Sequence, residues 1–353
     1  MQIQPLFFDK INTMTKVNQC NVKVNISTEK EGKKCAPLDT LAQLGTEHKK
    51  NTQKARRKYF SNGLSVGLVS ASERNEDSVL KKSYWRTYHC NSQINLHEVD
   101  GKKVLKSKYC NARWCMTCNA IRTAKHIIAY APIINEWDDA CFLTLTQKTV
   151  SKENLPLQLA EMYRIFSSIK HSAKMKHQRG QLSFKLEGIR KLECTFNKKT
   201  DLYHPHFHIV LKSMEMGKFI KDEWLKRNCN AGIKGQDCKK ADKYTLVELF
   251  KYMTKVIAST GKRPKTPNER VINADSLDVI FNALIGIRTV QSFGFLKPSI
   301  NEDCNAENPK VKGIADAVLQ WNDAATDWVD TDTGELFTGY KPSESFKKLI
   351  DNI

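Results

Sequence analysis

Two histidines on one predicted strand give this sequence its clearest candidate for metal chemistry. The segment His204-Pro205-His206-Phe207-His208 runs directly into Ile209-Val210-Leu211. Side chains alternate along a strand, so the histidines share one face and the apolar residues share the other. Two imidazoles two residues apart on a rigid strand can bind one divalent metal ion. The pattern therefore predicts either a metal site or surface histidines that bind nothing.

A carboxylate is expected beside these histidines. Residues 188–196 read as a second strand, joined to the first by the polar loop Asn197–Tyr203, and a hairpin is the natural pairing. One face of the hairpin should be buried, and it carries Leu192, Cys194, Phe196, Phe207, Ile209 and Leu211. Glu193 then lies on the opposite face with His206 and His208. This set predicts an open site for Mg²⁺ or Mn²⁺, although the imidazoles would also suit softer ions.

Two further residues of the hairpin are candidate contacts for a substrate. His204 lies on the same face as His206, one step closer to the loop, and is either a substrate contact or a spare ligand. Arg190, on the first strand of the hairpin, is a candidate DNA contact.

A tyrosine and a glutamate share one face of a predicted helix. Residues 243–257 have apolar side chains at helical spacing, and Glu248 and Tyr252 stand four residues apart. Lys251 and Lys255 flank them and are candidate DNA contacts. A nearby cation would favour the phenolate of Tyr252, which could attack a phosphodiester, and Glu248 could later activate water. A Glu and a Tyr at this spacing are also common as an ordinary surface pair.

Four of the eleven cysteines have the spacing of a zinc site. Cys90, Cys110, Cys115 and Cys118 read Cys-x19-Cys-x4-Cys-x2-Cys, and the last pair forms a knuckle. Four thiolates would hold a closed, structural Zn²⁺ ion. His89 or His97 could replace one ligand, and the alternative is four unrelated buried thiols.

The charge distribution favours a polyanionic partner. The chain has 353 residues and a net charge of +19, with 57 Lys and Arg against 38 Asp and Glu. Residues 301–353 hold 11 acidic and 5 basic residues, a net −6, so residues 1–300 carry +25. A basic body with an acidic tail is typical of nucleic-acid binding. The sequence has no Gly-x-x-x-x-Gly-Lys-[Ser/Thr] loop, so we expect no ATP hydrolysis by that route.

The pattern of segments predicts an α/β (α+β) fold with three regions. Residues 1–83 are polar and expected to be largely disordered, with a basic run at residues 48–58 that is either a solvated face or a phosphate contact. Residues 84–300 should form a catalytic domain with a central antiparallel sheet flanked by helices, including the cysteine-rich module at 88–118. Residues 301–353 should form an acidic appendage. Helices are expected at residues 120–134 and 155–178, and a buried strand at 140–146.

These motifs together resemble the replication initiators of rolling-circle plasmids, members of the His-hydrophobic-His endonuclease superfamily. The matching segments are residues 142–146, 203–211 and 248–255, and the Glu-x-x-x-Tyr spacing is similar to the subgroup in which Tyr nicks and Glu serves termination. Residues 110–118, and residues 283–288 together with 292–297, are similar to two further family segments. Met116 departs from the family pattern, the Gln147-Lys148 continuation of the first motif is not diagnostic, and residues 1–80 and 301–353 match no known family segment.

The resemblance implies a mechanism and a set of partners. His206 and His208 would bind Mg²⁺ or Mn²⁺, with Glu193 as the third ligand. Tyr252 would cut one strand of the plasmid origin, keep the 5′ phosphate as a phosphotyrosine and leave a 3′ hydroxyl as primer. The origin strand would be single-stranded or extruded as a hairpin, and a host helicase and polymerase would be needed.

Two other functions remain open at this point. A relaxase or transposase of the same superfamily would share the chemistry, and a non-catalytic, zinc-containing DNA-binding regulator would share only the basic body. No apolar run is long enough for a membrane helix and the first residues do not resemble a secretory signal, so we expect a bacterial cytoplasmic protein without a membrane partner.

Overall fold

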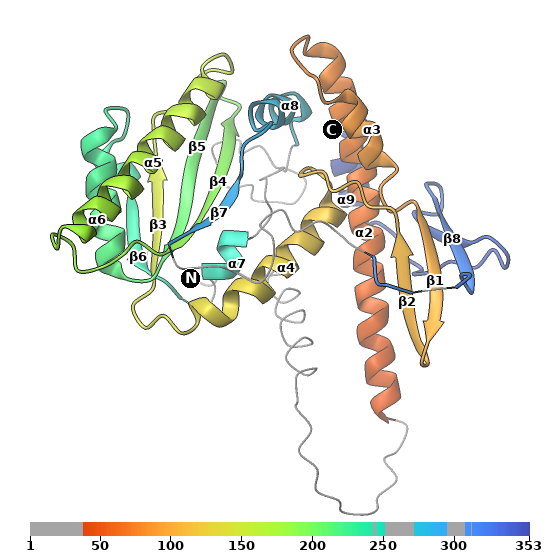
Figure 1. Ribbon diagram of the computed structural model, residues 1–353. Coiled ribbons are helices and arrows are strands. Elements are labelled where there is room, and N and C mark those ends of the chain that lie inside the picture. The colour runs from red at the N-terminus through yellow and green to blue at the C-terminus, as the bar shows by residue number, and fades with distance from the viewer. Residues whose placement is uncertain (1–37, 243–244, 251–271, 295–307, 312) are drawn as a thin grey trace, which may run out of the picture. The chain divides into compact units, whose positions relative to one another are not determined.

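A five-stranded antiparallel sheet carries the histidine segment (Figure 1). The computed structural model describes residues 38–242, 245–250, 272–294, 308–311 and 313–353. The sheet has the order β6-β3-β5-β4-β7, and its strands are β3 (Cys141–Thr146), β4 (Gly188–Asn197), β5 (Leu202–Leu211), β6 (Asp237–Lys240) and β7 (Val290–Phe293). Each neighbouring pair is antiparallel. The predicted α+β fold with a central antiparallel sheet is confirmed.

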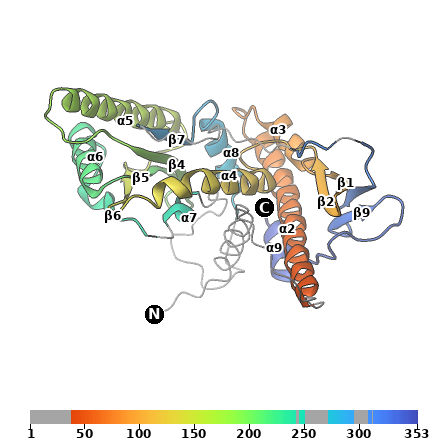
Figure 2. The same cartoon turned by 60° about the horizontal axis from the view of Figure 1, so that its bottom comes forward.

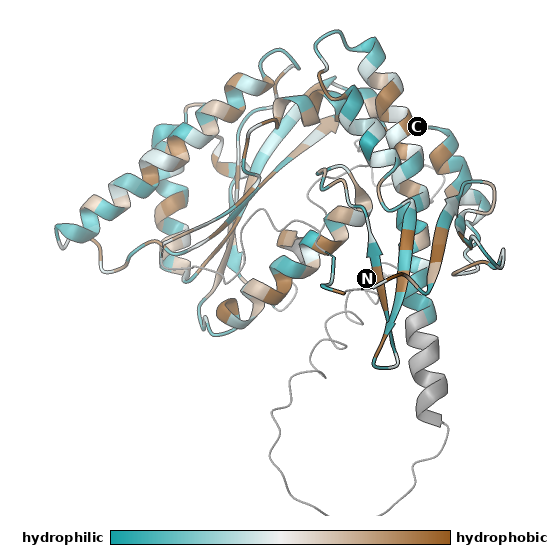
Figure 3. Cartoon of the chain, turned by 45° about the vertical axis from the view of Figure 1, so that its right-hand side comes forward, coloured by the Kyte–Doolittle hydropathy of each residue, from teal (hydrophilic) through white to brown (hydrophobic). Residues whose placement is uncertain are grey.

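Helices cover both faces of this sheet because apolar side chains emerge from both. Helices α5 (Leu155–Gln178) and α6 (Met214–Arg227) cover one face, where Phe207 packs with Phe166 and Trp224. Helices α4 (Met116–Ile134) and α7 (Thr245–Phe250) cover the other face at one end, where Val210 joins a separate apolar cluster. Figure 2 shows both pairs of helices, and Figure 3 shows polar and apolar residues alternating in short bands along the strands.

The β4–β5 hairpin has the register expected from its apolar pattern. Leu192 lies opposite Phe207, and both belong to the core beneath α5 and α6. Residues directly opposite each other in an antiparallel pair share a face. Glu193, which lies opposite His206, is therefore on the face toward α4 and α7.

Side chains near the ends of two of these helices fix where they begin. The Cys115 sulfur accepts a hydrogen bond from the Cys118 backbone N–H at 3.5 Å, so the cysteine knuckle is also the N-cap of α4. The Ser213 hydroxyl accepts from the Met216 N–H at 3.3 Å and starts α6 immediately after β5. The helices predicted at residues 120–134 and 155–178 are confirmed, the first beginning four residues earlier than expected.

The acidic C-terminal region is part of a second sheet. This four-stranded sheet has the order β2-β1-β8-β9, with β1 (Gln93–Val99), β2 (Lys102–Ser107), β8 (Ala317–Asn322) and β9 (Asp327–Asp330). Ile94 of β1 lies opposite Leu319 of β8 and shares a core with Trp328. The sequence predicted an acidic appendage at 301–353; instead, β8 pairs with β1, and Leu319 and Trp328 share a buried core with Ile94, so this part of the region belongs to a sheet that begins before residue 100.

The N-terminal region is helical where the structure describes it. Helix α2 (Leu38–Arg74) is followed by α3 (Lys81–Tyr88), so the expectation of disorder was wrong for residues 38–83. Two units are distinguished, residues 1–46 and 47–353, and both sheets with their cores lie within the second. Leu64 and Leu68 are buried in the main core, which explains why the helix forms despite its polar composition.

One residue of the basic run has an internal role. Lys58 is fully buried and donates to the Tyr88 carbonyl and, at 2.9 Å, to the Ser92 hydroxyl. Burial lowers the pKa of Lys58 to about 8. This lysine is thus neither solvated nor placed to meet phosphate.

A buried carboxylate joins these N-terminal helices to α8 (Ala274–Ala283). Asp278 accepts hydrogen bonds from the Tyr84 hydroxyl at 2.6 Å, the Ser78 hydroxyl at 2.7 Å and the Asn75 amide at 2.6 Å. The remaining α-helix of the described chain is α9 (Glu344–Asp351), whose Phe346 stacks on Phe60, and Ile233–Gly235 form the short 3-10 helix η1. Among the described residues, no helix combines the length and the apolar character needed to span a membrane.

Candidate metal centre and active site

Three side chains on neighbouring strands converge as the sequence predicts. Glu193 on β4 and His206 and His208 on β5 each offer one ligand atom, and these atoms lie within 4.8 Å of one another. The Glu193 Oε2 atom is 3.5 Å from His206 Nε2 and 3.6 Å from His208 Nε2. Two ligands about 2.1 Å from a shared metal ion are separated by about 3.0–3.4 Å, so the spacing fits one ion.

The other ring nitrogen of each histidine has its own partner. His206 Nδ1 lies 3.1 Å from the His204 backbone oxygen, which can only accept, so Nδ1 carries the proton. His208 Nδ1 lies 3.1 Å from the Thr144 hydroxyl on β3. Partners of this kind fix ring orientation in metal sites and leave Nε2 with its lone pair toward the ion. The donor set therefore fits a divalent cation.

Burial favours the neutral form of His208. Glu193 and His206 are buried and His208 is partly buried beneath the ring of Phe142, which stacks on it at 5.4 Å. Burial is the main cause that lowers the pKa of His208 below its usual value. A neutral imidazole is the form that binds metal.

Lys191 is a member of this site that the sequence reasoning missed. It lies directly opposite His208 and is fully buried on the same face. Its Nζ atom is 2.6 Å from Glu193 Oε1. Strand alternation was the available signal, because residues 191 and 193 must point the same way.

Arg190 is not placed to contact DNA, contrary to the sequence prediction. It is 2% exposed and points into the opposite core. Its guanidinium lies 4.2 Å from the ring centroid of Tyr163 and 4.7 Å from that of Phe207, and it donates to the Gln291 side chain. The sequence did not show that three aromatic rings and an amide could hold a buried arginine.

Helix α7 packs on the face that carries the candidate metal ligands. Leu249 and Phe250 share an apolar cluster with Val210, which lies two residues beyond His208 on β5. The predicted helix 243–257 is thus confirmed over Thr245–Phe250, and Glu248 lies in this helix. Outside the described parts of the chain lie the side chain of Glu248 and the residues Lys251, Tyr252 and Lys255, together with Tyr244.

Helix α4 holds the end of α7. The His126 ring stacks on Phe250 with centroids 5.2 Å apart and an interplanar angle of 6°. The Thr123 hydroxyl donates to the Phe250 carbonyl at 3.1 Å. Tyr130 stacks on the same phenylalanine at 5.8 Å. The chain two residues before Tyr252 is therefore fixed by three residues of α4.

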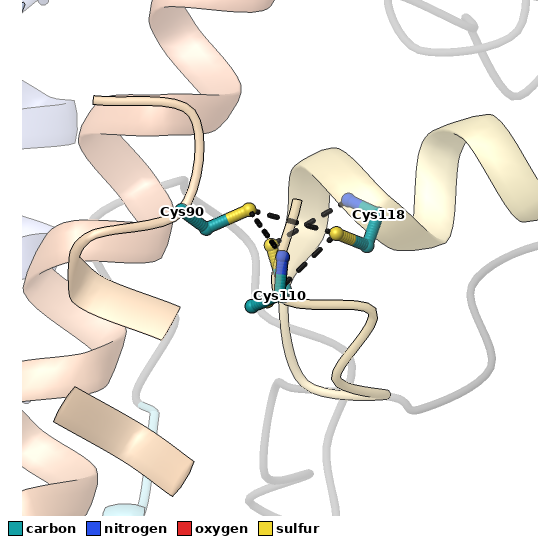
Figure 4. A group of neighbouring side chains, drawn as sticks. Cys90, Cys110 and Cys118 are labelled. Atoms are coloured by element: carbon teal, nitrogen blue, oxygen red, sulfur yellow. Dashed lines mark hydrogen bonds between the residues drawn. The ribbon is translucent and has the colours of Figure 1, made fainter. Parts of the chain in front are cut away.

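The four predicted cysteines form a cluster at the start of α4. Cys90, Cys110, Cys115 and Cys118 place their sulfur atoms within 4.8 Å of one another, and all four are free thiols. Figure 4 shows three of them, Cys90, Cys110 and Cys118. Cys118 Sγ lies 3.6 Å from Cys90 Sγ and 3.8 Å from Cys110 Sγ. Tetrahedral zinc with bonds of about 2.3 Å separates its sulfurs by about 3.8 Å. These two separations fit that geometry, and the group of four thiols includes neither His89 nor His97.

Backbone N–H groups point at the sulfurs, as thiolates require. The Cys110 N–H donates to Cys90 Sγ at 3.3 Å and the Ala112 N–H donates to Cys110 Sγ at 3.4 Å. Hydrogen bonding, above all with Cys115, holds the pKa of Cys110 well below its usual value. The cluster can hold Zn²⁺, and its knuckle would then set the start of the helix that supports α7.

His204 lies on the same face of the sheet as the candidate metal ligands and lines a cavity near them. It lies opposite Thr195, and its ring stacks on that of His206 at 5.4 Å. The cavity is also lined by Gln147, Lys148, Thr149, Thr195, Phe196 and Asn197. A substrate bound at the metal ligands could reach these side chains.

Comparison with known proteins gives one family. The sequence model of the family described as replication protein matches residues 101–344. A Bacillus amyloliquefaciens protein named Protein rep is 36% identical over 131 residues, which is 35% of this chain and 37% of the relative. A Streptococcus pneumoniae Protein rep is 24% identical over 208 residues, or 55% of this chain and 63% of the relative.

A third relative has the same name, and each of the three matches covers only part of this chain and part of the relative. The Staphylococcus aureus Protein rep is 30% identical over 139 residues, or 36% of this chain and 58% of the relative. The chain therefore spans between 37% and 63% of the length of these relatives. No solved structure matches.

Proposed function

The chain belongs to the replication-protein family, as its motifs led us to expect, and we propose that it initiates rolling-circle replication of a plasmid by nicking one strand of the origin. The observation that carries the proposal is the convergence of Glu193, His206 and His208 on the face where α7 packs. That face would bring a scissile phosphate, a metal ion and the tyrosine segment together.

The proposed chemistry is transesterification. A divalent cation on these three ligands, Mg²⁺ or Mn²⁺, would polarise a phosphoryl oxygen and offset the charge that develops on it. The Tyr252 phenolate attacks phosphorus, the bond to the 3′ oxygen breaks, and that oxygen takes a proton from water. The products are a 5′-phosphotyrosine and a free 3′ hydroxyl that serves as primer. Glu248 activates water, which later breaks the phosphotyrosine bond during termination.

The cysteine cluster has a supporting role in this proposal. Zn²⁺ on its four thiolates would fix the first turn of α4, and α4 contacts Phe250 through His126, Thr123 and Tyr130. The zinc module would thus hold the segment that leads to Tyr252. Origin DNA is the proposed partner, presented as a single strand or an extruded hairpin, and replication would need a host helicase and polymerase.

A nicking experiment tests the function. Purified protein is incubated with a supercoiled plasmid carrying its own origin, with Mg²⁺, Mn²⁺ or EDTA. We expect metal-dependent nicked circles with covalently attached protein. Tyr252→Phe should abolish nicking and keep DNA binding, whereas Tyr88→Phe, a control far from the metal ligands in sequence, should nick normally.

Other outcomes assign the function differently. If the Tyr252→Phe variant still cleaves DNA, the nucleophile is another residue, and Tyr244 is the first one to test. Normal termination by Glu248→Ala would remove the role of Glu248. Tight, origin-specific binding without any nick would show a non-catalytic regulator instead.

A further inference from the structure

The outer side of helix α3 combines an indole ring with basic side chains. The inner side is formed by Tyr84 and Thr87, which are buried. The exposed side consists of Lys82, Trp85, Arg86 and, at the C-cap, His89. With about 3.6 residues per turn, these four positions fall within an arc of about 100° opposite the buried side. We call these four residues the α3 face.

The cations of the α3 face have no carboxylate partner in the described part of the chain. Arg86 donates to the Ser83 hydroxyl at 3.4 Å, and Lys82 forms no ion pair with a described residue. Lys81 differs from both, since its Nζ atom lies 2.8 Å from Glu73 Oε1. Positive charge that no internal carboxylate offsets favours an anionic ligand at this face.

Trp85 indicates which anionic ligand fits. Its side chain belongs to a residue that is 43% exposed, which leaves a large aromatic ring open to a ligand. Proteins that bind single-stranded nucleic acid stack such rings on unpaired bases and place cations along the phosphates. The bases of an intact duplex already stack on one another, so a duplex would use the cations but not the ring. The α3 face therefore fits a single strand better than a duplex.

A cavity of about 200 Å³ lies beside Arg86. Ser83 and Arg86 line it from α3, Arg113 lines it from the loop before α4, and Thr289 lines it from the residue before β7. Arg113 donates to the Leu284 carbonyl at 3.1 Å, which holds this side chain at the cavity wall. None of the described residues that line the cavity is acidic. Its lining thus suits a phosphate group of a strand that passes over α3.

We propose that the α3 face binds single-stranded DNA, with Trp85 stacked on an unpaired base and with Lys82 and Arg86 on the phosphates that flank it. The inference rests on the proposed function for its ligand, the unpaired origin strand, and it adds a contact surface apart from the candidate metal ligands. His89 directly precedes Cys90 in the chain. Zn²⁺ on the cysteine cluster would therefore also fix the C-terminal end of this face.

Binding to short oligonucleotides tests the proposal without cleavage. Fluorescence anisotropy in EDTA measures the Kd values of (dT)12, a fully abasic 12-mer and a short duplex for the full chain at several KCl concentrations. The variants are Trp85→Leu, which keeps an apolar side chain without a ring, Trp85→Phe, which keeps a ring, and Arg86→Met. The controls are Val79→Ala, at an apolar position that is 76% exposed just before α3, and Lys102→Met, at an exposed position of β2.

The expected results separate base stacking from phosphate binding. Trp85→Leu should weaken binding of (dT)12 about tenfold and leave the abasic 12-mer unaffected, and Trp85→Phe should recover most of the loss. Arg86→Met should weaken both single strands by a similar factor and reduce the slope of log K against log [KCl] by about 0.7. Both controls should bind as the wild type does. The Tm of each variant should stay close to that of the wild type, because the changed side chains are exposed.

Two results would overturn the proposal and leave the proposed nicking function intact. The first is equal binding of (dT)12 by Trp85→Leu and by the wild type. The second is a loss in Trp85→Leu that is as large for the abasic 12-mer and the duplex as for (dT)12, because such a loss does not come from a base on the ring. A wild-type chain that binds none of the three probes would contradict the proposed function as well, so the two failures are distinguishable.

Discussion

Lys191 Nζ lies 2.6 Å from Glu193 Oε1, and the two side chains are 0% and 3% exposed. The carboxylate of the proposed metal site thus has a buried cation as its neighbour on the same strand. The pair leaves the cluster close to neutral when no metal is bound, which reduces the cost of burying Glu193. A bound divalent ion would instead leave a net positive centre, which suits an approaching phosphate.

Replacing Lys191 should separate stability from metal affinity. Lys191→Met leaves a buried carboxylate without this cation, so the free energy of unfolding in EDTA should fall by about 3–5 kcal/mol. Mn²⁺ should then stabilise the variant more than the wild type, because the ion supplies the missing positive charge. Thermal unfolding with EDTA and with Mn²⁺ measures both effects.

The control for that experiment is Lys198→Met, which removes an exposed lysine from the turn of the same hairpin. This variant should change neither the free energy of unfolding in EDTA nor the stabilisation by Mn²⁺. If Mn²⁺ stabilises Lys191→Met no more than the wild type, Lys191 does not act on the metal site.

The histidines should differ in their effect on metal binding. His206→Ala or His208→Ala removes a ligand nitrogen, and Mn²⁺ affinity measured by calorimetry should fall about 100-fold or more. His204→Ala is the matched control, since it shortens a histidine on the same face that is not part of the three-residue group. Equal losses in all three variants would argue against the assignment of two histidine ligands.

The faces and the register of the β4–β5 hairpin could be predicted from the sequence, because both depend on residues close together in the chain. Alternation fixes the faces of β4 and β5, and a run of apolar residues fixes the register, so the sequence alone could place Glu193 across from one of the two histidines. The four-cysteine cluster was predictable for a similar reason, since the knuckle spacing itself constrains the sulfurs.

The remaining features depend on contacts between distant segments. Arg190 looks like a surface cation, but three aromatic rings from α5 and β5 surround it. Lys58 belongs to a basic run, yet the Tyr88 carbonyl and Ser92 hold it in the core. The pairing of β1 with β8 joins residues more than 200 positions apart. No periodicity in a single segment carries such information.

The cysteine cluster should bind zinc tightly and support folding. We expect about one Zn²⁺ per purified chain by elemental analysis, and a lower Tm after a strong chelator removes it. The double variant Cys115→Ser/Cys118→Ser should lose the zinc, whereas Cys229→Ser, which changes an exposed cysteine outside the cluster, should retain it. Protein that is free of zinc and as stable as the loaded form would refute the structural role.

The contact between α4 and α7 should influence the rate of nicking without affecting metal or DNA binding. His126→Ala removes the ring that stacks on Phe250, so the segment leading to Tyr252 loses part of its support. We expect kcat for nicking to fall about tenfold or more, since small errors in the position of a nucleophile are costly. KM for origin DNA and Mn²⁺ affinity should stay close to those of the wild type. Ile128→Ala, at an exposed position of α4, should behave as the wild type. A fall in DNA affinity with an unchanged kcat would instead place His126 in DNA binding and contradict its role in positioning.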